Sequence, residues 1–250
     1  HRIKNQEYNY IMLVKMLSVF LFLIAVSSNA VLAQWTESGV SVCNSVYDQL
    51  FHKTAADGAG GALFVWRDYR HGDTNPDVYT QRINGDGYVL WGLGGVSACR
   101  APGFQTYAKI ESDGKGGGIV VWQDKRTGEY DIYVQRIGGD GTVLWAEDGL
   151  PVCDAVGDQT YPALVPDGIG GAIIVWKDFR DGFEDFYAQR VDSNGGKMWA
   201  PDGIRFCASG STDIEVSLTS SLPKADGFGG IIVVWADTRD VTTYTFAQRI

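Results

Sequence analysis

Short apolar runs separated by turn residues recur along this chain, and they are clearest between positions 160 and 207. None of the runs has the 3.6-residue spacing of an amphipathic helix. Glycine-rich segments reading DGIGG and DSNGG lie between them, and glycine at such positions is typical of hairpin turns. The pattern therefore predicts four strands joined by tight turns, at Thr160–Pro166, Ala172–Trp176, Asp185–Val191 and Lys197–Cys207.

The same succession of runs and turns occurs four times. Copies begin at Asp57, Asp113, Asp167 and Asp226, and their central tryptophans are 56, 54 and 59 residues apart. A repeat of this size indicates a propeller, a solenoid or another array. A solenoid has shorter coils, and a sandwich does not repeat its sequence. We therefore predict an all-β fold, a β-propeller of four-stranded antiparallel blades with about four blades in this chain.

The repeat also sets the predicted boundaries. Residues 34–43 (QWTESGVSVC) match the end of two later copies and are predicted to form the last strand of a blade. Blades then follow at approximately 44–99, 100–153 and 154–207, with an incomplete blade at 208–250. In a closed ring, the strand at 34–43 could complete that last blade. If the gene continues, the chain is a fragment of a larger ring, which is the alternative we favour.

The first 33 residues have the pattern of a leader and secretory signal peptide. Lys15 precedes an apolar segment at 17–26, which is short for a membrane span, and small residues lead to a cleavage site near Ala33. A buried helix or a membrane anchor is the less favoured alternative. We expect a protein that is secreted or held on the outer cell surface, with no transmembrane span after signal removal.

The net charge and the cysteine pattern exclude several classes of partner and cofactor. The chain has a formal net charge of -9, and removing the first 33 residues leaves -11. Nucleic acid and anionic membranes are therefore not expected partners, and polyanionic glycans would need a local basic patch. The four cysteines follow the repeat and contain no CxxC pair, so we expect neither zinc nor any other cofactor. They are predicted to be buried and unpaired, with disulfides as the alternative.

Three repeated motifs carry a family resemblance. The blades read DGxGGxxxVWxDxR, then DxYxQRI, then a DG turn followed by LW. They resemble the repeats of secreted bacterial β-propeller proteins, many of which have a C-terminal sorting domain for outer-membrane secretion. The turns before Trp91, Trp145 and Trp199 are similar to the Asp-box of sialidases, with a different spacing. The resemblance implies a fold and a compartment, and it leaves the activity open.

Polar residues recur at two positions of every blade. A Gln-Arg pair lies on the third strand, and we expect its arginine to pair with the aspartate of the Trp-x-Asp-x-Arg motif. That motif ends the second strand and enters a loop predicted to lie at the mouth of the central channel. A structural role is favoured, since residues present in every blade usually serve the blade. The candidate binding residues in these loops are Asp68, Arg70, Asp124, Arg126, Asp178, Arg180, Asp237 and Arg239.

Few other residues suggest chemistry. Asp73, Asn75 and Asp77 alternate as in a calcium loop, but the rest of that pattern is missing, so a solvated turn is favoured and no metal site is predicted. After the signal peptide only His52 and His71 remain, and no G-x-S-x-G or HExxH motif is present. No catalytic residue is assigned.

We therefore predict a monomeric binding or interaction module for an extracellular glycan or protein. The first alternative is a glycan-active hydrolase, similar to sialidases, or a lyase, and the second is a structural repeat of a larger surface protein. Arginines and carboxylates from different blades that converge with perturbed pKa values would favour the enzyme. Exposed aromatic residues on a regular repeat would favour binding.

Overall fold

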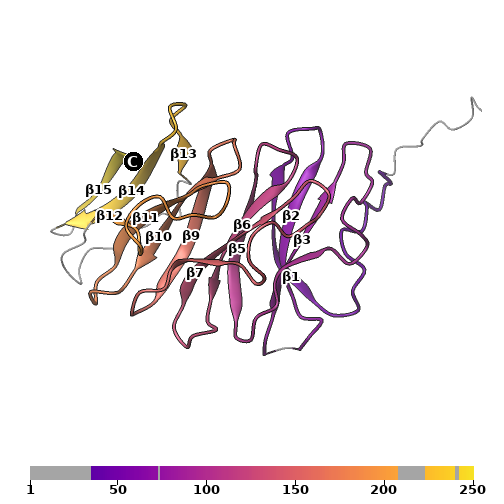
Figure 1. Cartoon of the computed structure of the whole chain (residues 1–250), viewed down its shortest axis with the longest axis horizontal. Coiled ribbons are helices and arrows are strands. Elements are labelled where there is room, and N and C mark those ends of the chain that lie inside the picture. Colours follow the sequence, from indigo (N-terminus) through magenta and orange to yellow (C-terminus); the bar gives the residue numbers. More distant parts are fainter. Residues whose placement is uncertain (1–34, 73, 208–222, 240–241) are drawn as a thin grey trace, which may run out of the picture.

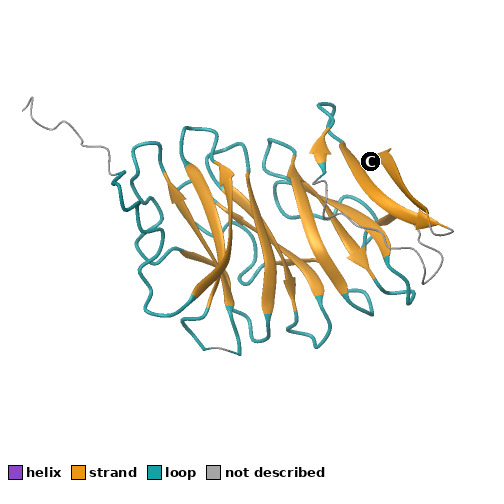
Figure 2. Cartoon of the chain, turned by 180° about the vertical axis from the view of Figure 1, so that it is seen from behind, coloured by secondary structure: helices purple, strands orange, loops and turns teal. Residues whose placement is uncertain are grey.

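The computed structural model describes residues 35–72, 74–207, 223–239 and 242–250, so the predicted leader and signal peptide lie outside the described residues. Strands and loops make up the whole described part, as Figure 2 shows. Within the same ranges, no helix has the length and apolar character needed to cross a membrane. The all-β prediction is confirmed.

The strands form four antiparallel sheets in chain order. The first contains β1 (Gln49–Ala56), β2 (Ala62–Asp68), β3 (Asp77–Ile83) and β4 (Val96–Cys99). The second contains β5 (Gln105–Ser112), β6 (Gly118–Asp124), β7 (Asp131–Ile137) and β8 (Leu150–Cys153). The third contains β9 (Gln159–Pro166), β10 (Ala172–Asp178), β11 (Asp185–Val191) and β12 (Ile204–Cys207). The fourth contains β13 (Lys224–Ala225), β14 (Ile231–Arg239) and β15 (Thr242–Arg249).

Each sheet is a meander, because strands adjacent in sequence are hydrogen-bonded neighbours. The sheets stand side by side in a row, from the first to the last, as Figure 1 shows. First strands of neighbouring sheets contact each other, β1 with β5 and β5 with β9, and so form the inner edge of the row. Meander sheets packed in this way are propeller blades. The predicted fold class is therefore confirmed.

The core lies between the blades. Trp122 of β6 is fully buried and packs in one apolar cluster with Leu63 and Val65 of β2. The next interface repeats this arrangement with Trp176, which belongs to a cluster containing Ile119 and Val121. The central strands β6 and β10 are therefore covered on both faces, and this explains why their residues are apolar on both faces.

The predicted fourth strand at 197–207 is shorter than expected. Only Ile204–Cys207 forms β12, while Lys197 makes an isolated bridge with Val191. A turn separates the two parts, with the Gly203 N–H donating to the Ala200 carbonyl at 2.9 Å. Gly203 has a φ of 84°, which interrupts an extended strand.

Residues 35–43 do not form the predicted last strand of a blade. The segment contains a turn, in which the Gly39 N–H donates to the Thr36 carbonyl at 2.9 Å, but it pairs with no described strand. Its equivalents in later copies pair with the third strand of their own blade, and no such strand is described beside this one. The Trp35 indole donates to the Gly85 carbonyl of the first blade at 2.8 Å, as Trp91 and Trp145 donate to turn carbonyls of the blades that follow them. The last sheet lies at the other end of the row (Figure 1), so this segment does not complete it.

The predicted partner of the Gln-Arg arginine is also wrong. Arg82 pairs with Asp57 at 2.9 Å, and Arg136 pairs with Asp113 at 2.7 Å. Both aspartates begin the glycine-rich hairpin turn, whereas Asp68 of the Trp-x-Asp-x-Arg motif lies at the other end of β2. The Arg82 side chain also donates to the Gly116 carbonyl of the next blade at 2.6 Å. This arginine therefore joins neighbouring blades as well as closing its own hairpin.

Cys43, Cys99 and Cys153 are free thiols, and Cys99, Cys153 and Cys207 are buried. Burial raises the pKa of Cys99 well above its usual range, and it raises that of Cys153 to about 12. Both thiols therefore stay protonated, and a protonated thiol is a poor nucleophile. We expect Cys99 and Cys153 to resist a thiol reagent at mildly alkaline pH in the folded protein. The half-buried Cys43 is the internal comparison, and equal labelling of all three followed by peptide mass spectrometry would contradict this.

Candidate binding surface on the inner edge of the blades

The Trp-x-Asp-x-Arg motif forms a closed cluster within each blade. In the first blade, the Trp66 indole donates to Asp68 Oδ2 at 2.7 Å, and Arg70 donates to both carboxylate oxygens at 2.7 and 2.8 Å. The guanidinium also lies over the Tyr79 ring, 3.8 Å from its centroid. Burial acts to raise the pKa of Asp68, but the hydrogen bonds from Arg70 and Trp66 outweigh it and hold the pKa below its usual value. The Asp68 carboxylate is thus ionised, and both of its oxygens accept hydrogen bonds within the blade.

The next two blades repeat this cluster. Arg126 and Arg180 each donate to a backbone carbonyl of their own outer turn, at 2.8 and 2.9 Å, and each also donates to the cysteine of the preceding blade at 3.2 Å. The motif residues therefore meet within a blade and do not converge between blades. Asp237 and Arg239 lie on β14, and their side chains are outside the described residues. These contacts are those expected of the favoured structural role, in which Asp68, Asp124 and Asp178 hold the loops.

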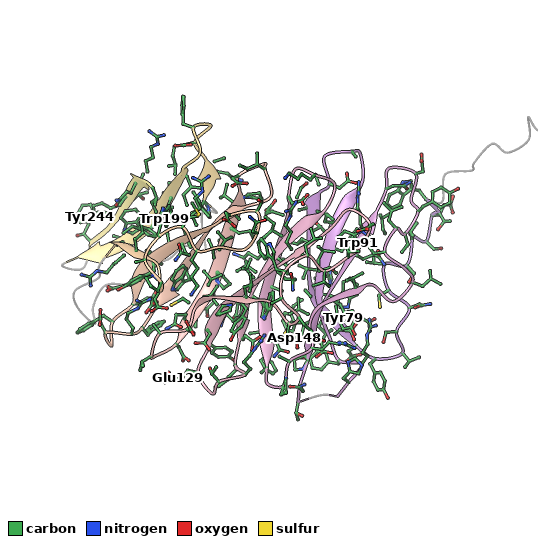
Figure 3. The ribbon with its side chains drawn as sticks, in the orientation of Figure 1. Tyr79, Trp91, Glu129, Asp148, Trp199 and Tyr244 are labelled. Atoms are coloured by element: carbon green, nitrogen blue, oxygen red, sulfur yellow. The ribbon has the colours of Figure 1, made fainter. Side chains whose placement is uncertain are left out.

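Two polar loop residues of the first blade line a cavity at its junction with the second. In Figure 3, Glu129 of the loop after β6 lies at one end of the blades, and Trp91 and Trp199, which follow the turns after β3 and β11, lie toward the other. The cavity has a volume of about 340 Å³, and it adjoins a second one of about 360 Å³ that includes Trp145. The first cavity is lined by His71, Asn75, Asp77, Arg100, Glu147 and Asp148.

Histidine and aspartate are paired in this cavity. His71 Nδ1 lies 2.6 Å from Asp77 Oδ2, and burial raises the pKa of Asp77 while His71 and Arg100 act to lower it. The calcium-like alternation does not converge here, because Asn75 accepts a hydrogen bond from the Gly103 N–H and Asp77 bonds to His71. Asp73 is outside the described residues.

An aromatic row lies on the inner edge and is the most unusual feature of the described residues. Phe51, Tyr107 and Tyr161 are each the third residue of the first strand in their blade, and they are 63%, 50% and 41% exposed. Their φ angles are 57°, 51° and 52°, in the left-handed region that favours glycine. The pairing register shifts beside each one, which identifies a β-bulge. The bulge presents the aromatic side chain at the surface.

Polar side chains from the second strands accompany this row, and they differ from blade to blade. The Arg67 guanidinium stacks on Phe51, 3.9 Å from the ring centroid, and Lys177 Nζ lies 5.4 Å from the Tyr161 ring. Gln123 occupies the equivalent position of the second blade, and its side-chain oxygen accepts from the Tyr161 N–H at 3.0 Å. Tyr107 and Tyr161 meet edge to face, with centroids 4.8 Å apart. The row is therefore one continuous surface over the second and third blades.

The sequence alone did not predict the aromatic row or the cavity between the first two blades. The repeated Gln-x-aromatic pattern at the start of each first strand, QLF, QTY and QTY, was a usable signal for the row. Arg100, Glu147 and Asp148 of the cavity come from positions that the repeat does not mark as special. His71 is one of two histidines outside the predicted signal peptide, and nothing in the sequence pairs it with Asp77.

No family model matches the chain, and no curated protein matches it. Among the solved structures that are similar in fold are two glycan-active enzymes. An endo-arabinase from Bacteroides thetaiotaomicron is 14% identical, with a TM-score of 0.44, and the match covers 86% of this chain and 81% of that one. An endo-1,4-beta-xylanase from the same organism is 8% identical, with a TM-score of 0.39, and the match covers 83% and 73%. Neither likeness is close enough to support a function for this chain.

Proposed function

We propose that this chain is a secreted or cell-surface β-propeller that binds a glycan through the aromatic row, without modifying it. The observation that supports this is the combination of strain and exposure at Phe51, Tyr107 and Tyr161. A left-handed backbone costs an L-residue about 1–2 kcal/mol, which glycine would avoid. Three blades keep an aromatic residue there although its ring is not buried. Such strain is typical of positions that contact a ligand.

A glycan fits the chemistry of this surface better than an apolar ligand does. A sugar ring has a face of C–H groups that can stack on an aromatic ring, and its hydroxyls need hydrogen-bond partners. Phe51 lies beside Arg67, and the tyrosines lie beside Gln123 and Lys177, so each ring has a polar neighbour. Exposed rings with a few polar groups are typical of such sites. One ring per blade also suits a ligand made of repeating units.

One observation favours a glycan-active hydrolase as the second candidate. The cavity between the first two blades combines Arg100, the His71–Asp77 pair and two further carboxylates, and the pKa of Asp77 is raised. Carboxyl groups with raised pKa values can serve as general acids in glycoside hydrolysis. Turnover of a panel of chromogenic glycosides, abolished by Asp77→Asn, would favour this enzyme over the binding module.

The binding proposal is tested by replacing Tyr107 with glycine. Tyr107→Gly removes the ring and relieves the strained φ, so we expect glycan binding to fall at least about tenfold while the unfolding temperature stays equal or rises. Binding would be measured by calorimetry with a panel of soluble oligosaccharides. Phe228→Ala, which removes an exposed ring from a distant turn, is the matched control and should bind normally.

Two results would contradict the proposal. If Tyr107→Gly lowers stability and leaves binding unchanged, the row is a packing feature. If the unaltered chain binds no oligosaccharide of the panel, the structural-repeat alternative becomes the better explanation.

A further inference from the structure

We infer that the glycan carries a carboxylate and that Arg67, at the first-blade end of the aromatic row, binds it. This inference rests on the proposed function and names the class of ligand.

Arg67 lacks a counter-charge within the described residues. Its Nη1 donates to the Thr106 hydroxyl at 3.0 Å, and no described carboxylate lies within ion-pair distance of it. Its Nε is buried and has no hydrogen-bond partner. By contrast, five motif arginines whose side chains are described are each paired with an aspartate: Arg70, Arg82, Arg126, Arg136 and Arg180. A half-buried guanidinium without a carboxylate partner is unfavourable, because its charge is partly desolvated and one N–H group is unsatisfied. An anionic ligand would supply the missing partner.

Aromatic rings hold Arg67 in place. The centre of its guanidinium lies 3.9 Å from the Phe51 ring centroid, 5.0 Å from that of Phe104 and 5.4 Å from that of Tyr69. A planar guanidinium stacked in this way is oriented before a ligand arrives, and its fork of N–H groups suits a carboxylate. Phe51 is the most exposed member of the aromatic row, so a sugar stacked on it would come close to this charge.

The equivalent positions of the other blades do not offer such a charge. Gln123 is neutral, and Lys177 is neutralised by an ion pair with Glu184. Only the first blade of the described three therefore presents an uncompensated cation beside its ring. The inference is accordingly specific: one acidic sugar lies at the first blade, and neutral contacts lie at the second and third.

Two lysines add positive potential to the same edge. Lys53 lies on β1 and Lys109 on β5, the contacting first strands of neighbouring blades, and burial together with the charge of Lys53 lowers the pKa of Lys109. Neither forms an ion pair with a described carboxylate, although Glu111 is close enough to act on Lys109. The chain as a whole is acidic, so a local concentration of cations gives an anionic ligand a defined place to bind.

The test compares acidic sugars with their neutral counterparts. Calorimetry would use two pairs of probes: trigalacturonate with α-1,4-galactotriose, and 3′-sialyllactose with lactose. We expect at least one acidic probe to bind at least about tenfold more tightly than its neutral partner, and the difference to shrink as ionic strength rises. Arg67→Gln, which installs the residue found in the second blade, should remove that difference. Lys115→Gln, which removes an exposed cation from the glycine turn of the second blade, is the control and should leave that difference unchanged.

The outcomes separate the two proposals. If acidic and neutral probes bind equally and Arg67→Gln changes neither, this inference is wrong and the glycan-binding proposal stands. If no probe binds to the unaltered chain, both are wrong. If Arg67→Gln lowers the affinity of both probes of a pair equally, Arg67 only positions Phe51, and the carboxylate assignment fails.

Discussion

Replacing Asp178 with alanine is expected to destabilise the protein by about 3–5 kcal/mol, the loss typical when one member of a buried ion pair is removed. Asp178 is 1% exposed and accepts hydrogen bonds from the Trp176 indole at 2.8 Å and from Arg180 at 2.6 and 2.8 Å. The substitution would leave the guanidinium facing the Tyr187 ring with no carboxylate. Urea unfolding followed by tryptophan fluorescence measures the change in the free energy of unfolding.

Two further variants make this result interpretable. Asp181→Ala alters an exposed carboxylate in the same loop and should change the free energy of unfolding by less than about 1 kcal/mol. The double variant Asp178→Ala/Arg180→Ala removes the charge together with its partner, so its loss should be smaller than the sum of the two single losses. Strict additivity would show that the ion pair contributes little of its own.

Replacing Gly203 with alanine should cost about 2–5 kcal/mol. The φ of 84° is unfavourable for alanine by about 1–2 kcal/mol. A Cβ there would also lie 2.5 Å from the Trp176 ring and 2.7 Å from the Ala188 carbonyl oxygen, and overpacking of this kind typically costs a further 1–3 kcal/mol. The free energy of unfolding, measured as above, gives the total.

Gly182 separates these two contributions. It lies in the same blade with a φ of 80°, and nothing lies within 4 Å of a Cβ built on it. Gly182→Ala should therefore show the backbone cost alone. Equal losses in Gly182→Ala and Gly203→Ala would mean that the Trp176 ring moves aside freely, and the tight packing described here would be wrong.

The blades could be predicted from the sequence because their determinants are local. The turn glycines and the runs around Trp122 and Trp176 specify hairpins and doubly covered strands without reference to distant residues. The partner of Arg82 could not be found in this way. A strand pattern gives the face on which a side chain lies, but two aspartates at opposite ends of the hairpin satisfy it equally well.

The candidate site was harder to predict for a different reason. The φ values of Phe51, Tyr107 and Tyr161 contradict what their residue types prefer, so propensity leads away from the bulge. The cavity was missed because it arises only when the loop after β2 meets the turn before β8 of the next blade. Repeat analysis compares equivalent positions and therefore does not pair residues such as His71 and Asp148.

The bonds between blades also bear on how such an array can grow in evolution. The two junctions among the first three blades use the same partners: a cysteine of one blade with the arginine of the next, and an indole of one with a turn carbonyl of the next. A duplicated segment of 54 residues, the distance from Cys99 to Cys153, carries both halves of a junction at its ends. Its insertion by recombination would thus create two ordinary junctions and require no compensating substitution. The number of blades can change while each blade stays the same.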